Sequence, residues 1–86
     1  MIKGKTKSGF EFEIDENVFD DWELLKNIRA IDKGESSLVV DVVETILGEQ
    51  AEALESHLKE MHGKVTITAM EEELEAIFEA SDSSKN

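Results

Sequence analysis

The chain contains neither cysteine nor proline. Without cysteine it can form no disulfide and no thiolate zinc site, and this composition is typical of a reducing compartment. Without proline, the five glycines are the strongest breaks in the sequence. A chain of 86 residues has room for one modest hydrophobic core. A core of that size without covalent staples typically supplies about 3–5 kcal/mol of stability.

Basic residues and long apolar runs are also scarce. Lys and Arg number 9 against 21 Asp and Glu, which gives a formal net charge of -12. Because phosphates and anionic lipid headgroups require a basic face, this balance disfavours nucleic acid and membrane surfaces as partners. No stretch approaches the ~20 apolar residues that cross a bilayer, and no signal-peptide pattern follows Met1. We therefore expect a cytoplasmic protein.

The excess of carboxylates has a plain interpretation and a specific one. The plain interpretation, which we favour, is that the charge keeps the protein dissolved. The specific interpretation is a basic protein partner or mimicry of nucleic acid. It draws on the segment 71–82, which contains six acidic residues and no basic one.

The N-terminal segment has the pattern of a β-hairpin over residues 2–14. Phe10, Phe12 and Ile14 alternate with glutamates, which is the period of a half-buried strand. The short connection around Gly9 predicts a tight turn. An isolated hairpin is marginal in water, so we expect its phenylalanine face to pack on helices.

The rest of the chain predicts four short helices separated by glycines. In the first, Val18, Trp22, Leu25 and Ile28 share one face, which Leu24 and Ile31 widen. The second is apolar nearly all round, with a polar strip of Asp41, Glu44 and Thr45, and should be the most buried element. The third has a narrow apolar stripe, and either Thr68 or Thr66 caps the fourth. The predicted ranges are about 18–33, 37–47, 49–62 and 68–80.

These patterns predict one fold and one domain. We expect a mainly α protein over residues 1–80, in which an N-terminal β-hairpin precedes a compact bundle of about four helices. By strict definition this is an α+β fold. Residues 81–86 are polar and are predicted to form a disordered tail.

We find no residue pattern that supports catalysis, a metal site or a cofactor. His57 and His62 are five residues apart, unlike the i, i+4 pair of a zinc helix. Ser56 adjoins His57 on a helix, so their side chains diverge. Asp41 and Glu44 are the only acidic residues within a strongly apolar segment, and we expect them to lie on the solvent-facing side of a mostly buried helix. Every glycine stands alone, so no phosphate loop is present, and we expect a protein that is not an enzyme.

Large apolar side chains on the helix stripes are the candidates for partner binding. Trp22 is the sole tryptophan and could anchor an interface, although its stripe position favours the core. Met61 and Met70 flank Gly63, where adaptable thioethers could line a groove for a helical peptide, although gap filling in the core is favoured. The candidate partner-binding residues are Trp22, Leu54, Leu58, Met61, Met70 and Phe78.

The order of these pieces resembles the small tail assembly chaperones of long-tailed, siphovirus-type bacteriophages. The resemblance covers roughly Gly9 to Phe78, and its motifs are caps, helix ends and core stripes. The runs that carry it are Phe19-Asp20-Asp21-Trp22-Glu23-Leu24-Leu25, Ile31-Asp32-Lys33-Gly34, Ile46-Leu47-Gly48-Glu49-Gln50, His57-Leu58 and Gly63-Lys64-Val65-Thr66.

The resemblance implies a scaffold that is not an enzyme and works in the host cytoplasm. Proteins of this family are thought to coat the long helical tape measure protein and to help tail tube protein assemble round it, and they are absent from the finished virion. The principal alternative is an acidic inhibitor that mimics nucleic acid, of the anti-restriction type. Another small phage regulator is a third. An exposed stripe on the third or fourth helix would favour a homo-oligomer.

Overall fold

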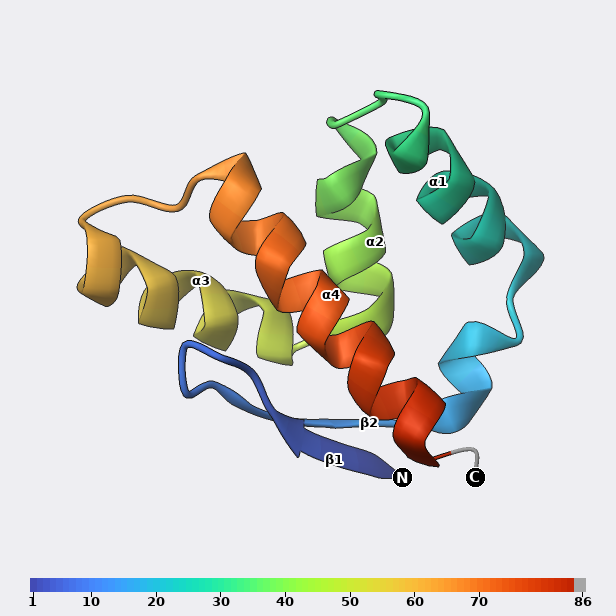
Figure 1. Cartoon of the computed structure of the whole chain (residues 1–86), viewed down its shortest axis with the longest axis horizontal. Helices are drawn as coiled ribbons and strands as arrows, with labels where there is room; N and C mark the ends of the chain where they lie inside the picture. The colour runs from blue at the N-terminus through green and yellow to red at the C-terminus, as the bar shows by residue number, and fades with distance from the viewer. Residues whose placement is uncertain (85–86) are drawn as a thin grey trace.

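The hairpin forms as the alternation predicts. In the computed structural model, which describes the backbone of residues 1–84 and the side chains of residues 1–81, β1 (Ile2–Lys5) and β2 (Glu11–Ile14) pair antiparallel. Figure 1 shows the hairpin lying beneath the helices. Phe10, Phe12 and Ile14 are buried, so their face packs on the helices as expected.

The outer edge of β2 is closed by a side chain from a helix. Helix α3 (Gln50–His62) begins with Gln50, whose Oε1 accepts a hydrogen bond of 2.9 Å from the backbone N–H of Glu13. Its Nε2 donates to the carbonyl oxygen of the same residue at 2.6 Å. The Gln50 amide therefore replaces one residue of a neighbouring strand. Such closure protects an exposed edge from pairing with another chain.

Gln50→Ala is therefore expected to lower the free energy of unfolding by about 1–2 kcal/mol, because two hydrogen bonds of about 0.5–1.5 kcal/mol are lost at a partly exposed site. Urea denaturation followed by circular dichroism measures the change. Ser56→Ala on the exposed face of the same helix is the control and should change stability by less than about 0.5 kcal/mol. Equal stability of the two variants would contradict a role for the amide.

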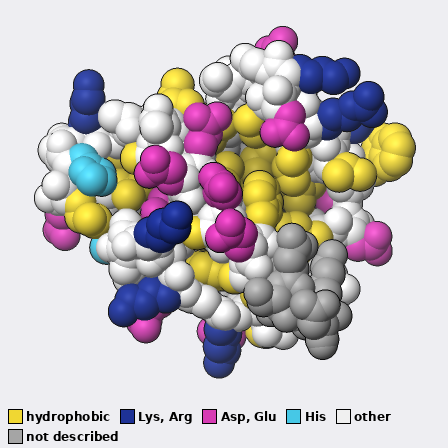
Figure 2. All heavy atoms as spheres, in the orientation of Figure 1, with side chains coloured by type: hydrophobic (Ala, Val, Ile, Leu, Met, Phe, Trp, Pro, Cys, Tyr) yellow, Lys and Arg dark blue, Asp and Glu magenta, His cyan; other side chains and the backbone are white. Residues whose placement is uncertain are grey.

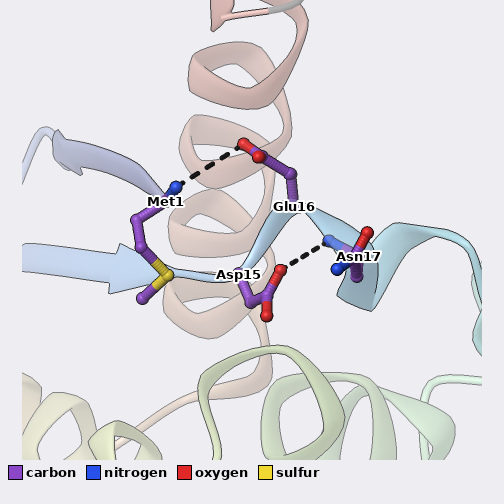
Figure 3. Close-up of polar contacts among 4 residues, drawn as sticks. All are labelled: Met1, Asp15, Glu16 and Asn17. Carbon is purple, nitrogen blue, oxygen red and sulfur yellow. Dashed lines mark hydrogen bonds and ion pairs between the residues drawn. The ribbon is translucent and has the colours of Figure 1, made fainter.

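The first helix begins later than the sequence pattern predicts. Residues Glu16–Phe19 form a 3-10 helix, η1, and α1 spans Trp22–Asp32. The side chain of Asp15 accepts from the backbone N–H of Asn17 and caps η1, and the N-terminal amine of Met1 lies 3.7 Å from Glu16 Oε2 (Figure 3). Both partners of this ion pair are exposed, so it contributes little stability.

A second cap places the start of α1. Asp21 Oδ1 accepts from the backbone N–H groups of Glu23 and Leu24, at 2.9 and 3.2 Å. Because Val18 lies outside α1, it does not define the buried stripe. Leu24 is the buried residue of α1, and Trp22 is 75% exposed. The prediction that Trp22 belongs to the core is therefore wrong.

Helix α2 (Leu38–Leu47) lies at the centre of the bundle. It packs against α1, α3, α4, β2 and η1. It begins one residue later than predicted and ends where predicted, and the polar strip of Asp41, Glu44 and Thr45 is exposed as expected. The five buried residues of α2 are Val39, Val42, Val43, Ile46 and Leu47.

The last two helices are joined around a glycine in a left-handed conformation. Gly63, with φ of 81°, ends α3, and its N–H donates to the carbonyl oxygen of Lys59 at 2.8 Å. Thr66 rather than Thr68 caps the next helix, because its Oγ1 accepts from the N–H of Ala69 at 3.0 Å. Positive φ at this end suits glycine, which has no Cβ to clash.

Helix α4 (Ile67–Ser84) extends beyond its predicted end. Ser81 is buried, and its hydroxyl donates to the carbonyl oxygen of Ile77 at 3.1 Å, which accommodates a polar residue on the inner face. The predicted disordered tail is therefore wrong for residues 81–84, and its last two positions, 85 and 86, lie outside the described residues. Buried apolar side chains from both strands and from α1, α2, α3 and α4 form one core cluster.

Candidate functional site

Large apolar side chains remain exposed in the described structure, mainly on two surfaces. One surface follows α1 and carries Trp22 and Leu25. The other joins α2 to the start of α4 and carries Val40, Val65 and Ile67. Exposed apolar surface rimmed by charge is typical of a protein-binding site.

An apolar groove of about 270 Å³ separates α1 from α4. Both helices pack on α2, and the fully buried Val42 of α2 lies among the residues that line the groove. Figure 2 shows the apolar side chains gathered between α4 and α1. The apolar residues of the walls are Ile28 and Ile31 from α1 and Leu74 and Phe78 from α4.

A ridge of apolar side chains extends the α1 wall. Trp22, Leu25, Ile28 and Ile31 recur at every third residue, so they form a row inclined to the helix axis. The row passes from the exposed Trp22 and Leu25, which are 75% and 58% exposed, to the two half-buried isoleucines in the groove. Apolar surface therefore continues from the groove toward the start of α1.

The opposite wall is held in place by an aromatic contact. The rings of Phe19 in η1 and Phe78 in α4 meet edge to face, with 6.2 Å between centroids and 69° between planes. This is a favoured aromatic geometry. Because Phe78 also lines the groove, its contact with Phe19 of η1 helps to hold the α4 wall in place.

All charged residues that line the groove are acidic. They are Asp32 of α1 and Glu71 and Glu75 of α4, and the two glutamates are one helical turn apart. Figure 2 shows acidic side chains running along α4 beside the apolar hollow. The only ion pair within the described part of the chain is between Met1 and Glu16, so none of these three carboxylates has a cationic partner there.

The second apolar surface surrounds a hollow of about 290 Å³. Val40, Val65 and Ile67 are 60%, 38% and 56% exposed around it. Glu44 and Glu55 are the charged residues of its lining. This surface lies on a different side of α2 from the groove, and it serves below as a matched control.

A third hollow, of about 410 Å³, has a mixed polar and apolar lining and lies between the hairpin turn, α3 and α4. Its buried acid is Glu73, which is 4% exposed and accepts a hydrogen bond of 2.8 Å from Ser8 Oγ. Thr6 Oγ1 lies 3.0 Å from the same hydroxyl and accepts from the backbone N–H of Phe10. His57 Nε2 lies 2.9 Å from the carbonyl oxygen of Ser8.

These contacts fasten the hairpin turn to α3 and α4. His57 meets the backbone of Ser8 rather than its hydroxyl, so the imidazole is not placed as a base for that hydroxyl. Among the described residues, no group of three His, Asp or Glu is arranged to hold a metal, and no buried side-chain nitrogen or oxygen lacks a partner. Within the same residues, no helix is both long enough and apolar enough to cross a membrane.

The predicted partner-binding residues divide between core and surface. Leu54 and Leu58 are 0% and 1% exposed, and Met70 is buried as well. These three residues belong to the core and are not available to a partner in this structure, because the stripes of α3 and α4 face inward. Trp22 and Met61 are exposed, at 75% and 52%, and Phe78 is half-buried in the groove wall.

Two features were missed from the sequence. The sequence pattern places Ile28 and Ile31 on a core face, because periodicity cannot show that a groove remains between α1 and α4. Glu73 was not singled out as a buried acid, although it is three residues after Met70 and four before Ile77 and so shares the inner face of α4. That spacing was a usable signal.

Comparison with known proteins yields no match to a family model, to a curated protein or to a solved structure. Function is therefore inferred from the surface of the chain itself.

Proposed function

We propose that this protein is an assembly chaperone, not an enzyme, which holds a helical segment of a client protein in the groove between α1 and α4. The observation that carries the proposal is the open apolar groove, whose α1 wall continues into the exposed Trp22 and Leu25. An amphipathic helix buries its apolar face in such a groove. The remaining acidic surface keeps the complex dissolved.

The resemblance to tail assembly chaperones supports a particular client. In that case the helical client is the tape measure protein of a phage tail, and tail tube protein is the further partner. The protein would then act in the host cytoplasm before the virion is complete. Binding in many copies along an extended client would also permit contact between neighbouring copies.

Removal of apolar side chains beside the groove should weaken client binding. Trp22→Ser/Leu25→Ser is expected to reduce affinity for the tape measure protein of the same genome by at least tenfold, because truncation of an aromatic anchor commonly costs about 2 kcal/mol. Both residues are more than half exposed, so the fold should be retained. Biolayer interferometry with the immobilised client measures the affinity.

The matched control removes the same kind of surface elsewhere. Val40→Ser/Ile67→Ser also deletes two exposed apolar side chains, from the second hollow, and should change affinity by less than about threefold. A larger effect of this control pair would move the client site to the second hollow. Absence of binding by the unaltered protein at moderate salt would contradict the proposed function.

One observation favours a second candidate function, mimicry of nucleic acid. Glu71, Glu75 and Glu79 follow one another at intervals of four residues on α4 and form a row of carboxylates. A mimic would bind a basic partner with an affinity that falls steeply with salt. Docking driven by apolar burial predicts a shallower salt dependence, so the steepness of the fall in affinity between about 50 and 500 mM salt separates the two functions.

A further inference from the structure

We infer that the groove between α1 and α4 selects an amphipathic helix of about three turns whose apolar stripe is flanked by lysine or arginine. This inference rests on the proposed function, since it specifies the chemistry of the segment that the groove would hold. Three properties of the groove lead to it: its length, its lining and the sign of its charges.

The α1 wall and the apolar row that extends it set the length of the occupant, because the row from Trp22 to Ile31 runs along most of α1. Helix α1 has 11 residues, which corresponds to about 16 Å at 1.5 Å per residue. A helix lying along this wall can therefore contact it over about three turns. Its apolar residues would recur at i, i+3 or i+4, and i+7, which is the spacing of the anchor residues that helix-binding grooves contact.

The lining makes the contact apolar at its centre. Four large apolar side chains form the walls, and Val42 lies beneath them. The occupant would cover Ile28 and Ile31, which are half-buried, and approach Leu25, which is 58% exposed. Burial of this apolar area supplies the attraction.

The charges make the contact selective. The charged residues of the lining are Asp32, Glu71 and Glu75, from both walls, and no basic side chain lines the groove. None of the three has a cationic partner within the described residues. A helix with lysine or arginine beside its apolar stripe would place cations near these carboxylates, whereas acidic flanks would place like charges together.

Two designed peptides test the inference. They share one leucine stripe in a helix of about 18 residues, since shorter isolated helices are marginal in water, and they carry either lysine or glutamine on both flanks. Fluorescence anisotropy of the labelled peptides measures their affinity for the full chain. The lysine-flanked peptide is expected to bind more tightly than the glutamine-flanked peptide.

The protein variants separate local from overall charge. Glu71→Gln/Glu75→Gln removes two carboxylates from the lining, and Glu72→Gln/Glu79→Gln removes two from the same helix that do not line the groove. The first double variant should lower the affinity for the lysine-flanked peptide by about threefold to tenfold, as expected for the loss of two exposed ion pairs. The second pair should weaken it by less than about twofold, and neither pair should alter binding of the glutamine-flanked peptide.

The outcomes distinguish this inference from the proposed function. The inference is overturned if both double variants weaken binding of the lysine-flanked peptide equally. It is also overturned if neither peptide binds. If the tape measure protein still binds in that case, the proposed function stands. If the lysine-flanked peptide is selected through Glu71 and Glu75 but the tape measure protein does not bind, the inference stands and the client is a different helix.

Discussion

Leu54→Ala is expected to lower the free energy of unfolding by about 3 kcal/mol, within the range of about 2–5 kcal/mol for such truncations in a core. Leu54 is 0% exposed and belongs to the single core cluster. The variant loses buried apolar surface and leaves a cavity that rigid neighbours fill only in part. Urea denaturation followed by circular dichroism measures the loss.

The size of this loss matters because the domain is small. Native stability is typically about 0.05–0.15 kcal/mol per residue, which gives about 4–13 kcal/mol for a chain of this length. If the total stability is near the lower end of this range, a loss of about 3 kcal/mol would remove most of it. Loss of client binding by Leu54→Ala would therefore reflect unfolding, and this variant is unsuitable as a probe of the partner surface.

Leu25→Ala is the matched control, because it deletes the same atoms from a helix at a site that is 58% exposed. Its stability should change by less than about 0.5 kcal/mol, as is usual for surface substitutions. Its affinity for a helical client should fall, since Leu25 continues the α1 wall of the groove. Equal loss of stability by the two variants would show that the assignment of Leu54 to the core is wrong.

Much of the fold follows from local patterns. The alternation around Phe12 predicts the hairpin, and the structure confirms it. Gly34, Gly48 and Gly63 follow the ends of three helices, as predicted. These features could be predicted because a strand period or a helix end depends on residues close together in the sequence.

The start of α1 could not be fixed in the same way. Asp15 and Asp21 both provide capping side chains, and the pattern does not decide which begins the long helix. Because α1 begins at Trp22 and not at Val18, Val18 lies in η1 and the inner face of α1 is set by Leu24. Trp22 consequently leaves the core and becomes the most exposed of the large hydrophobic residues.

The groove itself depends on tertiary structure. Ile28, Ile31 and Phe78 each fit a core stripe, and only the packing of α1 and α4 on α2 leaves them half-buried in a groove wall. An apolar stripe has the same sequence pattern whether it is covered by a neighbouring helix of the same chain or by a partner protein. Sequence periodicity therefore predicts apolar faces but not which of them remain open.

The second large effect is expected at Gly4, where β1 approaches both a phenylalanine ring and α4. A Cβ at this position would lie 2.7 Å from Phe12 Cζ, 3.1 Å from Phe12 Cε1 and 3.3 Å from the Cβ of Ala80. The ring of Phe12 is 4% exposed and is held within the core, so it cannot move aside freely. Gly4→Ala should therefore lower the free energy of unfolding by about 1–3 kcal/mol, as overpacking does.

The sign of this effect separates the clash from backbone propensity. Alanine in a strand is ordinarily favoured over glycine by about 0.5–1 kcal/mol, so a loss requires a steric cause. In a Phe12→Leu background, the shorter side chain leaves room for the new methyl group, and Gly4→Ala should cost less than about 1 kcal/mol or become favourable. Urea denaturation of the four proteins in this cycle measures the coupling. If Gly4→Ala lowers stability equally in both backgrounds, the Phe12 ring is not the cause of the loss. If the loss is much smaller with Phe12→Leu, the absence of a side chain at residue 4 is what allows β1 to pack closely on α4.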